Sequence, residues 1–356
     1  MTEILKEAMF WEPQPKNTVL CTLCPHFCRI KDGFYGVCGV RKNEGGKLYT
    51  LIYGRAAALN VDPIEKKPLF HFFPGSRSMS IATVGCNFKC DFCQNWDLSQ
   101  ASKGKGRHFD GRMIKPAEVV ALAKNYNCRT IAFTYSEPTI FYEYAYDTAR
   151  LATAERIYGV FVSNGYITLE ALEKIRPYLF GYNVDLKSFN PSYYRRVLHG
   201  KLEPVLESLK KIKELGFWLE VTTLVVPTKN DSDEELAKIA RFICGLGPDV
   251  PWHVSAFHPD YKMTDLPRTS IATLKRARQI GLDTGLRYVY TGNVPGDDGE
   301  STFCYNCGAM VIKRLGFSII DNRITAGKCP DCGTVIDGVA MDPHGQEKVD
   351  LRVSRA

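Results

Sequence analysis

The most informative part of this sequence is the stretch SMSIATVGCNFKCDFC, which runs from Ser78 to Cys93. Its first seven residues are mostly apolar or β-branched and predict a strand, and the loop after them spaces its cysteines as C-x3-C-x2-C. Thiolates are the usual ligands of [4Fe–4S] clusters, so Cys86, Cys90 and Cys93 can bind three irons of one cluster and leave the fourth open. A zinc knuckle and three unrelated core cysteines are the alternatives to this interpretation.

The composition is ordinary for a soluble globular protein. The chain has 356 residues, of which 45% are hydrophobic and 24% are charged, so it can form one large domain and one or two small ones. No apolar run approaches the ~18 residues of a membrane span. The N-terminus shows no basic region followed by an apolar one. We therefore expect a cytoplasmic protein that does not enter a membrane.

Thirteen cysteines in a cytoplasmic chain indicate metal sites rather than disulfides. Only Cys128 and Cys244 stand apart from the three cysteine groups, and both are expected to be small buried apolar side chains. The first group, spaced C-x2-C-x3-C-x9-C, lies in a turn-rich segment and comprises Cys21, Cys24, Cys28 and Cys38. Tetrahedral Zn²⁺ and a second [4Fe–4S] cluster both suit it. His26 could add a ligand, although a surface turn position is the simpler interpretation.

A second metal site is predicted near the C-terminus. Two C-x-x-C-G knuckles supply Cys304, Cys307, Cys329 and Cys332, and they resemble a zinc ribbon or a rubredoxin site. We expect Zn²⁺ there, because no redox role is evident, although a rubredoxin-type iron would use the same ligands. The polar residues after Ala340 are expected to be poorly ordered.

Between these two ends, strand-like and helix-like segments alternate. We expect strands near 79–84, 130–135, 158–163, 181–186, 217–226, 252–257 and 286–291, and helices near 116–126, 140–155, 168–178, 203–215, 232–244 and 270–281. Asp231, with Glu234 three residues later, is the expected N-cap of the helix from 232. The alternation predicts an α/β fold with parallel strands, as a partial (βα)6 TIM-like barrel; a doubly wound open sheet is the alternative.

The predicted domains follow from these patterns. Residues 1–77 form an N-terminal Cys-rich module with a lead-in segment, and residues 78–299 form the partial barrel. Residues 300–340 form the zinc-ribbon-like module, and residues 341–356 form a polar tail. The lead-in has Pro or Gly every few residues, so it cannot be a long helix. Its His71 is either a proton donor near the active site or a packed side chain.

Polar side chains follow the predicted strands, at the edge where parallel α/β barrels carry their functional groups. They include carboxylates suited to an ammonium group, an amine suited to a carboxylate, and amides and hydroxyls suited to a ribose. The segments are Thr134–Pro138, Ser163–Gly165, Asp185–Lys187, Val226–Asp231 and His253–Pro259. Asn230 and Asp231 have an alternative role as helix caps.

The chain resembles radical S-adenosylmethionine (SAM) enzymes related to pyruvate formate-lyase activating enzymes, and within them the radical SAM member of the AmmeMemoRadiSam system. The resemblance covers most of the chain, including both cysteine-rich ends. It rests on the motifs EKKPLFHFFPG (65–75), GCNFKCDFCQNW (85–96), TYSEPT (134–139), SNGY (163–166) and VDLK (184–187).

The resemblance implies a [4Fe–4S] cluster on Cys86, Cys90 and Cys93, with SAM on its open iron. The SAM-binding residues that it implies are Phe92, Ser136, Glu137, Ser163, Asn164, Asp185, Lys187 and His258, with His253 as a weaker choice. Many relatives have Gly-Gly-Glu where this chain has Tyr135-Ser136-Glu137. The sequence therefore does not show whether this chain makes the backbone contacts to SAM that the two glycines make in those relatives. Trp96 is expected either beside the substrate or in the core.

The implied function is reductive cleavage of SAM, followed by hydrogen abstraction from a small molecule. A glycyl-radical-generating enzyme acting on a partner protein is the alternative. The implied partners are a low-potential electron donor of the flavodoxin or ferredoxin type, together with Memo-type and AMMECR-type proteins. A metal-stapled nucleic-acid-binding protein is a third possibility, suggested by the formal charge of +7. Thiolate-bound metals would offset most of that charge, so nucleic acid is not an expected partner.

Overall fold

A central sheet of eight strands organises the computed structural model, which describes residues 5–294, 296–346 and 349–351. Seven strands are parallel, and β8 pairs antiparallel with β9 at one edge. In spatial order they are β16 (Val289–Gly292), β15 (Trp252–Ala256), β14 (Trp218–Val225), β13 (Leu179–Asp185), β12 (Tyr158–Ser163), β11 (Cys128–Phe133), β9 (Arg77–Ala82) and β8 (Ala58–Pro63).

The parallel strands lie side by side in the order in which the chain makes them. A doubly wound sheet reverses its strand order at a switch point, so that alternative is wrong. Among the described residues β8 and β16 do not pair with each other, and the sheet is open. The α/β fold with a parallel sheet is thus confirmed, whereas closure toward a partial (βα)6 barrel stays a prediction.

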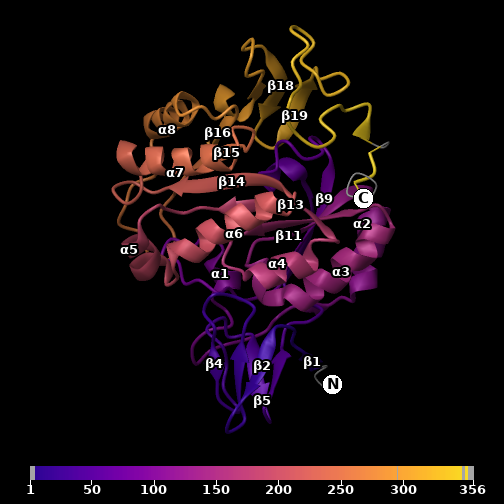
Figure 1. The fold of residues 1–356 in the computed structure, drawn as a ribbon, viewed down its shortest axis with the longest axis vertical. Coiled ribbons are helices and arrows are strands. Elements are labelled where there is room, and N and C mark those ends of the chain that lie inside the picture. Colours follow the sequence, from indigo (N-terminus) through magenta and orange to yellow (C-terminus); the bar gives the residue numbers. More distant parts are fainter. Residues whose placement is uncertain (1–4, 295, 347–348, 352–356) are drawn as a thin grey trace.

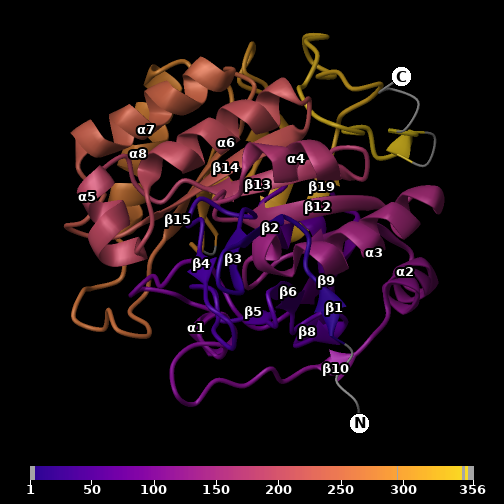
Figure 2. The ribbon, with the colours of Figure 1, turned by 60° about the horizontal axis from the view of Figure 1, so that its bottom comes forward.

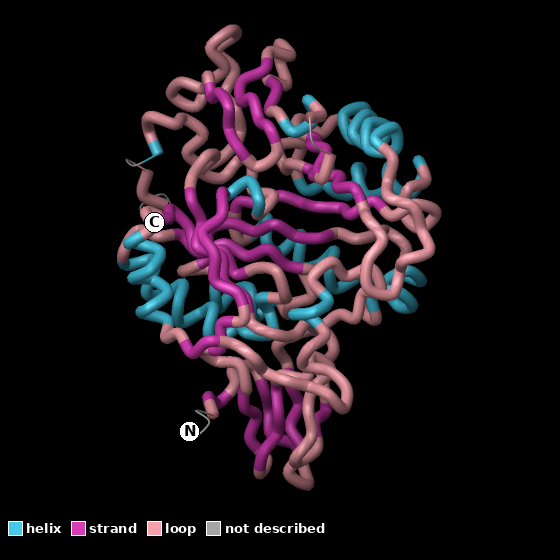
Figure 3. Tube along the Cα trace, turned by 180° about the vertical axis from the view of Figure 1, so that it is seen from behind, coloured by secondary structure: helices cyan, strands magenta, loops and turns pink. Residues whose placement is uncertain are grey.

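Helices cover one face of the sheet. Figure 3 views the molecule from the side opposite to Figure 1, with the strands in front and these helices behind them. They are α2 (Pro116–Asn125), α3 (Tyr142–Ala154), α4 (Leu169–Ile175), α6 (Leu202–Glu214), α7 (Asp233–Leu246) and α8 (Ile271–Asp283). Helix α6 illustrates why they pack: Leu202, Val205, Leu209 and Ile212 recur at helical spacing and are all buried. None of the described helices is long and apolar enough to cross a bilayer.

The predicted strands and helices agree closely with these bounds, but the predicted cap of α7 is wrong. Ser232 is the N-cap, and its side chain accepts a hydrogen bond from the backbone N–H of Glu235. Asp231 instead accepts from the backbone N–H of Thr228 at 2.8 Å, because it closes the preceding turn.

The lead-in segment covers the other face of the sheet. It contains β8 and the 3-10 turn η1 (Ile64–Lys66), followed by a run of turns up to Gly75, and it forms no long helix, as its Pro and Gly content predicted. Ile64, Leu69, Phe72 and Phe73 pack in one cluster with residues of β11, β12 and β13. Glu220 of β14 fixes this stretch by accepting the backbone N–H groups of Phe70 and His71.

The two cysteine-rich modules lie at opposite ends of the long axis (Figure 1). The N-terminal module contains β1 (Lys6–Glu7), β2 (Trp11–Gln14), β3 (Thr18–Cys21), β4 (Arg29–Ile30), β5 (Arg41–Glu44) and β6 (Lys47–Thr50). They form two small antiparallel sheets, and β7 (Arg55–Ala56) pairs with β10 (Arg112–Met113) beyond them. Figure 2 shows this module beside α1 (Trp96–Ser99), the helical turn that follows the C-x3-C-x2-C loop.

The C-terminal module is the antiparallel sheet β17 (Thr302–Phe303), β18 (Met310–Leu315) and β19 (Ser318–Asn322) with its two knuckles. Of the predicted polar tail, residues 347–348 and 352–356 lie outside the described residues, and the described part makes contacts with the sheet. The guanidinium of Arg129 donates to the carbonyls of Gln346 and Val349, both at 2.8 Å. Met341 is buried as well, so the tail returns to the sheet.

Candidate active site

A cavity of about 320 Å³ opens at the carboxyl ends of the parallel strands. Cys86, Cys90 and Cys93 line it together with all but one of the predicted SAM-binding residues. Those residues are Phe92, Ser136, Glu137, Ser163, Asn164, Asp185 and Lys187. Segments from β9, β11, β12 and β13 thus meet at one place, as expected for strand ends that share one edge of a parallel sheet.

Two of the three loop cysteines have hydrogen-bonding groups beside their sulfurs. The sulfur of Cys86 lies 3.3 Å from the backbone N of Phe88 and 3.7 Å from Nδ2 of Asn164. The sulfur of Cys93 lies 3.2 Å from the hydroxyl of Ser99. Burial raises the pKa of Cys90 to about 12, against the opposing effect of the Lys187 ammonium. A bound metal would favour the thiolate form of this buried sulfur.

Glu137 organises one side of the cavity. Its carboxylate accepts hydrogen bonds from the backbone N–H of Thr139, the hydroxyl of Ser163 and the backbone N–H of Asn164, at 2.8–2.9 Å. Burial raises the pKa of Glu137, and these three bonds oppose that shift. A carboxylate can accept about four hydrogen bonds, so one position remains for a ligand ammonium.

Tyr135 stands where many relatives have a glycine, and its backbone conformation shows how a tyrosine takes that place. Its φ is 63°, in the left-handed region that glycine adopts most easily, so this tyrosine takes a glycine-like backbone conformation next to the cavity. Such conformations cost about 1–3 kcal/mol and occur often at functional sites. The neighbouring Ser136 hydroxyl is buried without a partner among the described residues. A bound ligand would satisfy it, which fits a polar nucleoside in this cavity.

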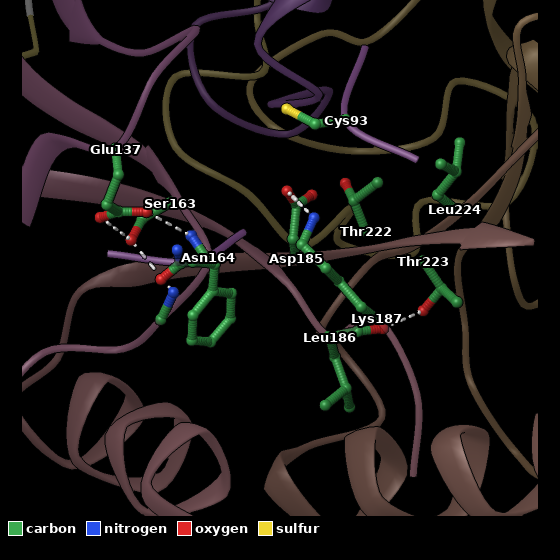
Figure 4. Close-up of polar contacts among 12 residues, drawn as sticks. Cys93, Glu137, Ser163, Asn164, Asp185, Leu186, Lys187, Thr222, Thr223 and Leu224 are labelled. Carbon is green, nitrogen blue, oxygen red and sulfur yellow. Dashed lines mark hydrogen bonds and ion pairs between the residues drawn. The ribbon is translucent and has the colours of Figure 1, made fainter. Parts of the chain in front are cut away.

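Asp185 and Lys187 form the opposite side of the cavity. Figure 4 shows the two side chains turned toward each other below Cys93, with Glu137, Ser163 and Asn164 grouped apart from them. The Nζ of Lys187 lies 2.8 Å from Oδ2 of Asp185. Burial disfavours the ammonium, but Asp185 and the sulfur of Cys90 outweigh it and raise the pKa of Lys187. Lys187 therefore stays charged and can attract a ligand carboxylate.

His258 lies beside the cavity rather than in its wall. It lines an adjoining cavity of about 430 Å³, and its Nδ1 is 2.8 Å from Nε2 of Gln94. Gln94 and Phe317 line both cavities, so the two spaces adjoin each other at these side chains. Phe317 comes from the turn between β18 and β19, which means that the C-terminal module contributes to the wall.

Two further histidines considered as site residues, His71 and His253, lie outside the wall of this cavity. His71 is fully buried between the carbonyl of Asp337 and the hydroxyl of Tyr290, each at 2.6 Å, so it is packed and does not line the cavity. His253 is also buried, but it lines the adjoining cavity and pairs with Glu220 at 2.7 Å.

Trp96 is 45% exposed and stacks on Tyr261, which excludes the core position. Neither Asn230 nor Asp231 lines the cavity. Asn230 accepts the backbone N–H of Val226 and donates to the carbonyl of Lys187, so both residues fix the loop before α7. Neither caps that helix, because Ser232 is its N-cap, and the capping alternative is therefore wrong as well.

The two cysteines outside the three groups, Cys128 and Cys244, differ in burial, and His26 contacts the C-x3-C-x2-C loop. Cys128 is buried, as predicted, while Cys244 is only partly buried, with its sulfur 3.5 Å from the carbonyl of Thr284. His26 is half-buried, and its Nε2 lies 2.8 Å from the carbonyl of Asn87. No disulfide forms among the thirteen cysteines, all of which lie in the described residues.

The four C-terminal cysteines form a compact group that could hold a metal ion, with all four sulfurs within 4.8 Å of one another. The sulfurs of Cys304 and Cys332 are 3.6 Å apart, and those of Cys307 and Cys329 are 3.8 Å apart. A tetrahedral ion with bonds of about 2.3 Å would separate its sulfurs by about 3.8 Å. The predicted ligand set therefore has the geometry of a mononuclear site.

Sequence reasoning missed several residues of the cavity wall, chiefly Lys66, Pro68, Thr222, Leu224, Asn293 and Phe317. Thr222 and Leu224 lie within β14, and the inward direction of strand residues would have suggested them once the strand was placed. Nothing in the local sequence around Asn293 or Phe317 marks them, because tertiary packing alone brings these segments to the cavity.

Comparisons with known proteins agree with this geometry. Residues 80–243 match the model of the Radical SAM superfamily. An uncharacterized protein of Methanocaldococcus jannaschii is 45% identical over 336 residues, which cover 94% of this chain and 99% of that protein. A second protein of that organism has the provisional name glycyl-radical enzyme activating enzyme. It is 27% identical over 211 residues, which cover 58% of this chain and 78% of that protein.

Solved structures resemble parts of the chain. A domain of the pyruvate-formate lyase-activating enzyme from Bacteroides vulgatus has a TM-score of 0.41 and 18% identity, covering 46% of this chain and 98% of that domain. A radical SAM methyltransferase from Sphaerobacter thermophilus has a TM-score of 0.49 and 18% identity, covering 63% of this chain and 68% of that one.

Proposed function

Because this chain belongs to the radical SAM superfamily, we propose that it cleaves SAM reductively and abstracts a hydrogen atom from a compact substrate. One observation carries the proposal. The three loop cysteines share a cavity with an ammonium, two carboxylates and an unpartnered hydroxyl, the groups that a zwitterionic nucleoside needs.

Cys86, Cys90 and Cys93 would hold a [4Fe–4S] cluster, which supplies the electron that cleaves the sulfonium bond of SAM. The residues of this chain bind and orient the SAM. Lys187 attracts its carboxylate, and the remaining acceptor position of Glu137 faces its ammonium. Ser163 and Asn164 are held in place by Glu137, so this carboxylate also acts as a positioning residue. Phe92 is buried against Tyr193 and would contact the adenine.

A small molecule or a small partner-bound group is the proposed substrate. The adjoining cavity that His258, Gln94 and Phe317 line lies next to the SAM-binding side chains, and its volume falls in the range typical of small-molecule pockets. Because the C-terminal module supplies part of this wall, the space left for a substrate is bounded on that side.

Activation of a glycyl-radical enzyme is the second candidate function. The provisional name of the relative with 27% identity favours it. In this case a loop of a partner protein would enter the cavity that we assign to the compact substrate. A nucleic-acid-binding function leaves the polar set around the three loop cysteines without a role.

The proposal also includes a structural metal ion and partner proteins. We propose that the C-terminal cysteines bind Zn²⁺, and that a flavodoxin-type or ferredoxin-type protein supplies the electron. The AmmeMemoRadiSam resemblance adds Memo-type and AMMECR-type proteins as proposed partners, in the cytoplasm.

Formation of 5′-deoxyadenosine under anaerobic conditions, with SAM and a chemical reductant, tests the proposed reaction. We expect the product from the parent protein and none from Cys86→Ala, Cys90→Ala or Cys93→Ala, while Cys244→Ala serves as the control. Product formation in any of the three loop variants would refute the cluster assignment. A glycyl radical signal on a partner protein after turnover would favour the second candidate, whereas deuterium transfer between a small molecule and 5′-deoxyadenosine would favour the first.

Lys187→Met tests the SAM-binding part of the proposal. It keeps most of the apolar stem but removes the charge that faces a ligand carboxylate. A charged hydrogen bond contributes about 1.5–3 kcal/mol, so we expect SAM affinity to fall by roughly 10- to 100-fold with unchanged iron content. Lys229→Met, at an exposed position after the next strand, is the matched control. Parallel loss of iron and affinity would make Lys187 a structural residue instead.

A further inference from the structure

Arg41 brings a charged hydrogen-bond donor to the N-terminal cysteine group. The sulfur of Cys21 lies 3.6 Å from Nη1 of Arg41. Burial raises the pKa of the thiols of Cys24, Cys28 and Cys38, and a nearby backbone group opposes that rise at each of them. Three of the four thiols are buried. Donors of this kind stabilise thiolates, and they are among the features that set the potential of an iron–sulfur cluster.

Arg41 brings a positive charge into the same region. Its side chain is 2% exposed and is paired with Glu143, and Nη1 also donates to the carbonyl of Met9 at 2.8 Å. The remaining nitrogen, Nε, is buried and has no partner among the described residues. A buried donor without an acceptor is costly, so an additional acceptor at this position, such as a sulfur of a bound cluster, would stabilise the protein.

The spacing of the N-terminal sulfurs separates a cluster from a single ion. Within the described parts of the chain, the C-terminal group is the one set of at least three ligands whose donor atoms all lie within 4.8 Å. No three of the N-terminal sulfurs are gathered so tightly. In a [4Fe–4S] cluster each sulfur binds a different iron, which holds the sulfurs farther apart than one tetrahedral ion does.

The N-terminal group also lies directly behind the loop of Cys86, Cys90 and Cys93. Nε2 of His26 is 2.8 Å from the carbonyl of Asn87 on that loop. Asn87 in turn accepts a hydrogen bond from Nδ2 of Asn164, which also donates to the sulfur of Cys86. A chain of contacts thus joins the two cysteine groups.

A second connection runs through the segment after α1. The hydroxyl of Ser102 donates to the carbonyl of Cys38 at 2.7 Å, and the ammonium of Lys103 donates to the carbonyl of Phe88. Gly39 and Gly85, the neighbours of Cys38 and Cys86, both lie against Ser102 as well. The backbone beside each sulfur site thus contacts the same residue, so the two sites lie close together, which suits electron transfer between them.

We propose that Cys21, Cys24, Cys28 and Cys38 bind a redox-active [4Fe–4S] cluster that relays single electrons to the cluster on Cys86, Cys90 and Cys93. One electron enters from an external low-potential donor and passes to the second cluster, without making or breaking a bond to a ligand. The relay rests on the proposed function, whereas the identity of the N-terminal metal does not.

Metal analysis of one variant decides the identity of the metal. In full-length C86A/C90A/C93A protein, reconstituted anaerobically with iron and sulfide, the loop site is removed and the N-terminal group is intact. We expect about four irons per chain to remain, the content of one [4Fe–4S] cluster, with an electron paramagnetic resonance signal after reduction by dithionite. Iron near zero with a second zinc per chain would overturn the proposal. The result does not depend on whether the parent protein cleaves SAM.

The relay is tested in C24S/C38S protein, with Cys128→Ser as the control. The rate at which reduced flavodoxin bleaches the visible absorption of the loop cluster is followed by stopped flow. We expect a clear decrease in this rate relative to Cys128→Ser, while the change that SAM causes in the resonance signal of the loop cluster is preserved. An unchanged rate would refute the relay. Should C24S/C38S not fold, spin coupling between the two reduced clusters in the parent protein provides the second measurement, and two independent, uncoupled signals would refute the relay.

Discussion

The two cysteine-rich ends of the molecule each offer four sulfurs, but they arrange them differently. At the C-terminal end the sulfurs lie 3.6–3.8 Å apart in pairs, and Cys307 and Cys332 are exposed. At the N-terminal end three of the four cysteines are buried beside the charged side chain of Arg41. These differences favour the two kinds of site that we propose, a single ion at the C-terminal end and a cluster at the N-terminal end.

The two ends also reach the cavity from different sides. The N-terminal module contacts the loop of Cys86, Cys90 and Cys93 through His26. The C-terminal module places Phe317 at the junction of the two cavities. This difference suggests that the N-terminal end serves electron supply and the C-terminal end serves the shape of the substrate site.

The largest expected effect is a separation of metals between the two ends. In C304S/C329S protein we expect the loss of about one zinc per chain with unchanged iron, because a four-thiolate site cannot hold Zn²⁺ on two ligands. Structural zinc contributes directly to folding, so residues 304–336 should become sensitive to proteolysis. Metal analysis and limited proteolysis check both points, with Cys244→Ser as the control. Loss of iron together with zinc would contradict the separation.

A smaller effect is expected from the buried charge at the N-terminal end. Arg41→Met leaves Glu143 buried without its partner, which should lower the free energy of unfolding by about 3–5 kcal/mol. Lys42→Met, on the same strand, removes half of a partly exposed pair with Glu44 and should cost at most about 1 kcal/mol. Urea unfolding of the metal-loaded protein under anaerobic conditions measures both. Equal losses would show that Arg41 has no special role.

The sequence predicted most of what lies on regular elements. The spacing of Cys86, Cys90 and Cys93 identified the loop, and the strand-end rule placed Ser163, Asp185 and Lys187 in one cavity, because parallel strands end at a common edge. Competition among neighbouring capping residues shifted the cap of α7 from Asp231 to Ser232, since either side chain can close a turn. Phe317 was out of reach, because its place depends on how a distant module docks.

The docking of the C-terminal module should weaken in acid. His71 contacts this module through the carbonyl of Asp337, and burial lowers its pKa to about 4 from an ordinary value of about 6.5. The unfolded chain therefore binds more protons between these values. Stability from this group is complete above about pH 6.5, falls as the pH drops toward 4, and changes by at most about 3 kcal/mol.

Hydrogen exchange of residues 304–336 between pH 7 and pH 4 measures this effect. We expect His71→Gln to remove this part of the pH dependence, while the exposed control His108→Gln retains it. The N-terminal module has no contact with His71 among the described hydrogen bonds, so its exchange should change less over the same range. Equal changes at both ends would contradict the assignment to His71.

The smallest expected effect concerns Phe317, and it separates the roles of the two ends most directly. Phe317 is 49% exposed, and the turn that carries it is fixed by a hydrogen bond from the backbone N–H of Gly316 to Glu300 at 2.8 Å. Truncation to alanine removes apolar surface from the substrate side of the cavity but no group that contacts the loop cysteines. Losing a half-buried aromatic contact corresponds to about 1 kcal/mol, so we expect KM for a substrate found by deuterium transfer to rise about fivefold. SAM affinity, iron content and cleavage of SAM without substrate should stay unchanged. Phe34→Ala, which removes an exposed phenylalanine from the N-terminal module, should alter none of these quantities. If Phe317→Ala lowered SAM affinity and left KM unchanged, the C-terminal module would belong to the cofactor site rather than to the substrate site.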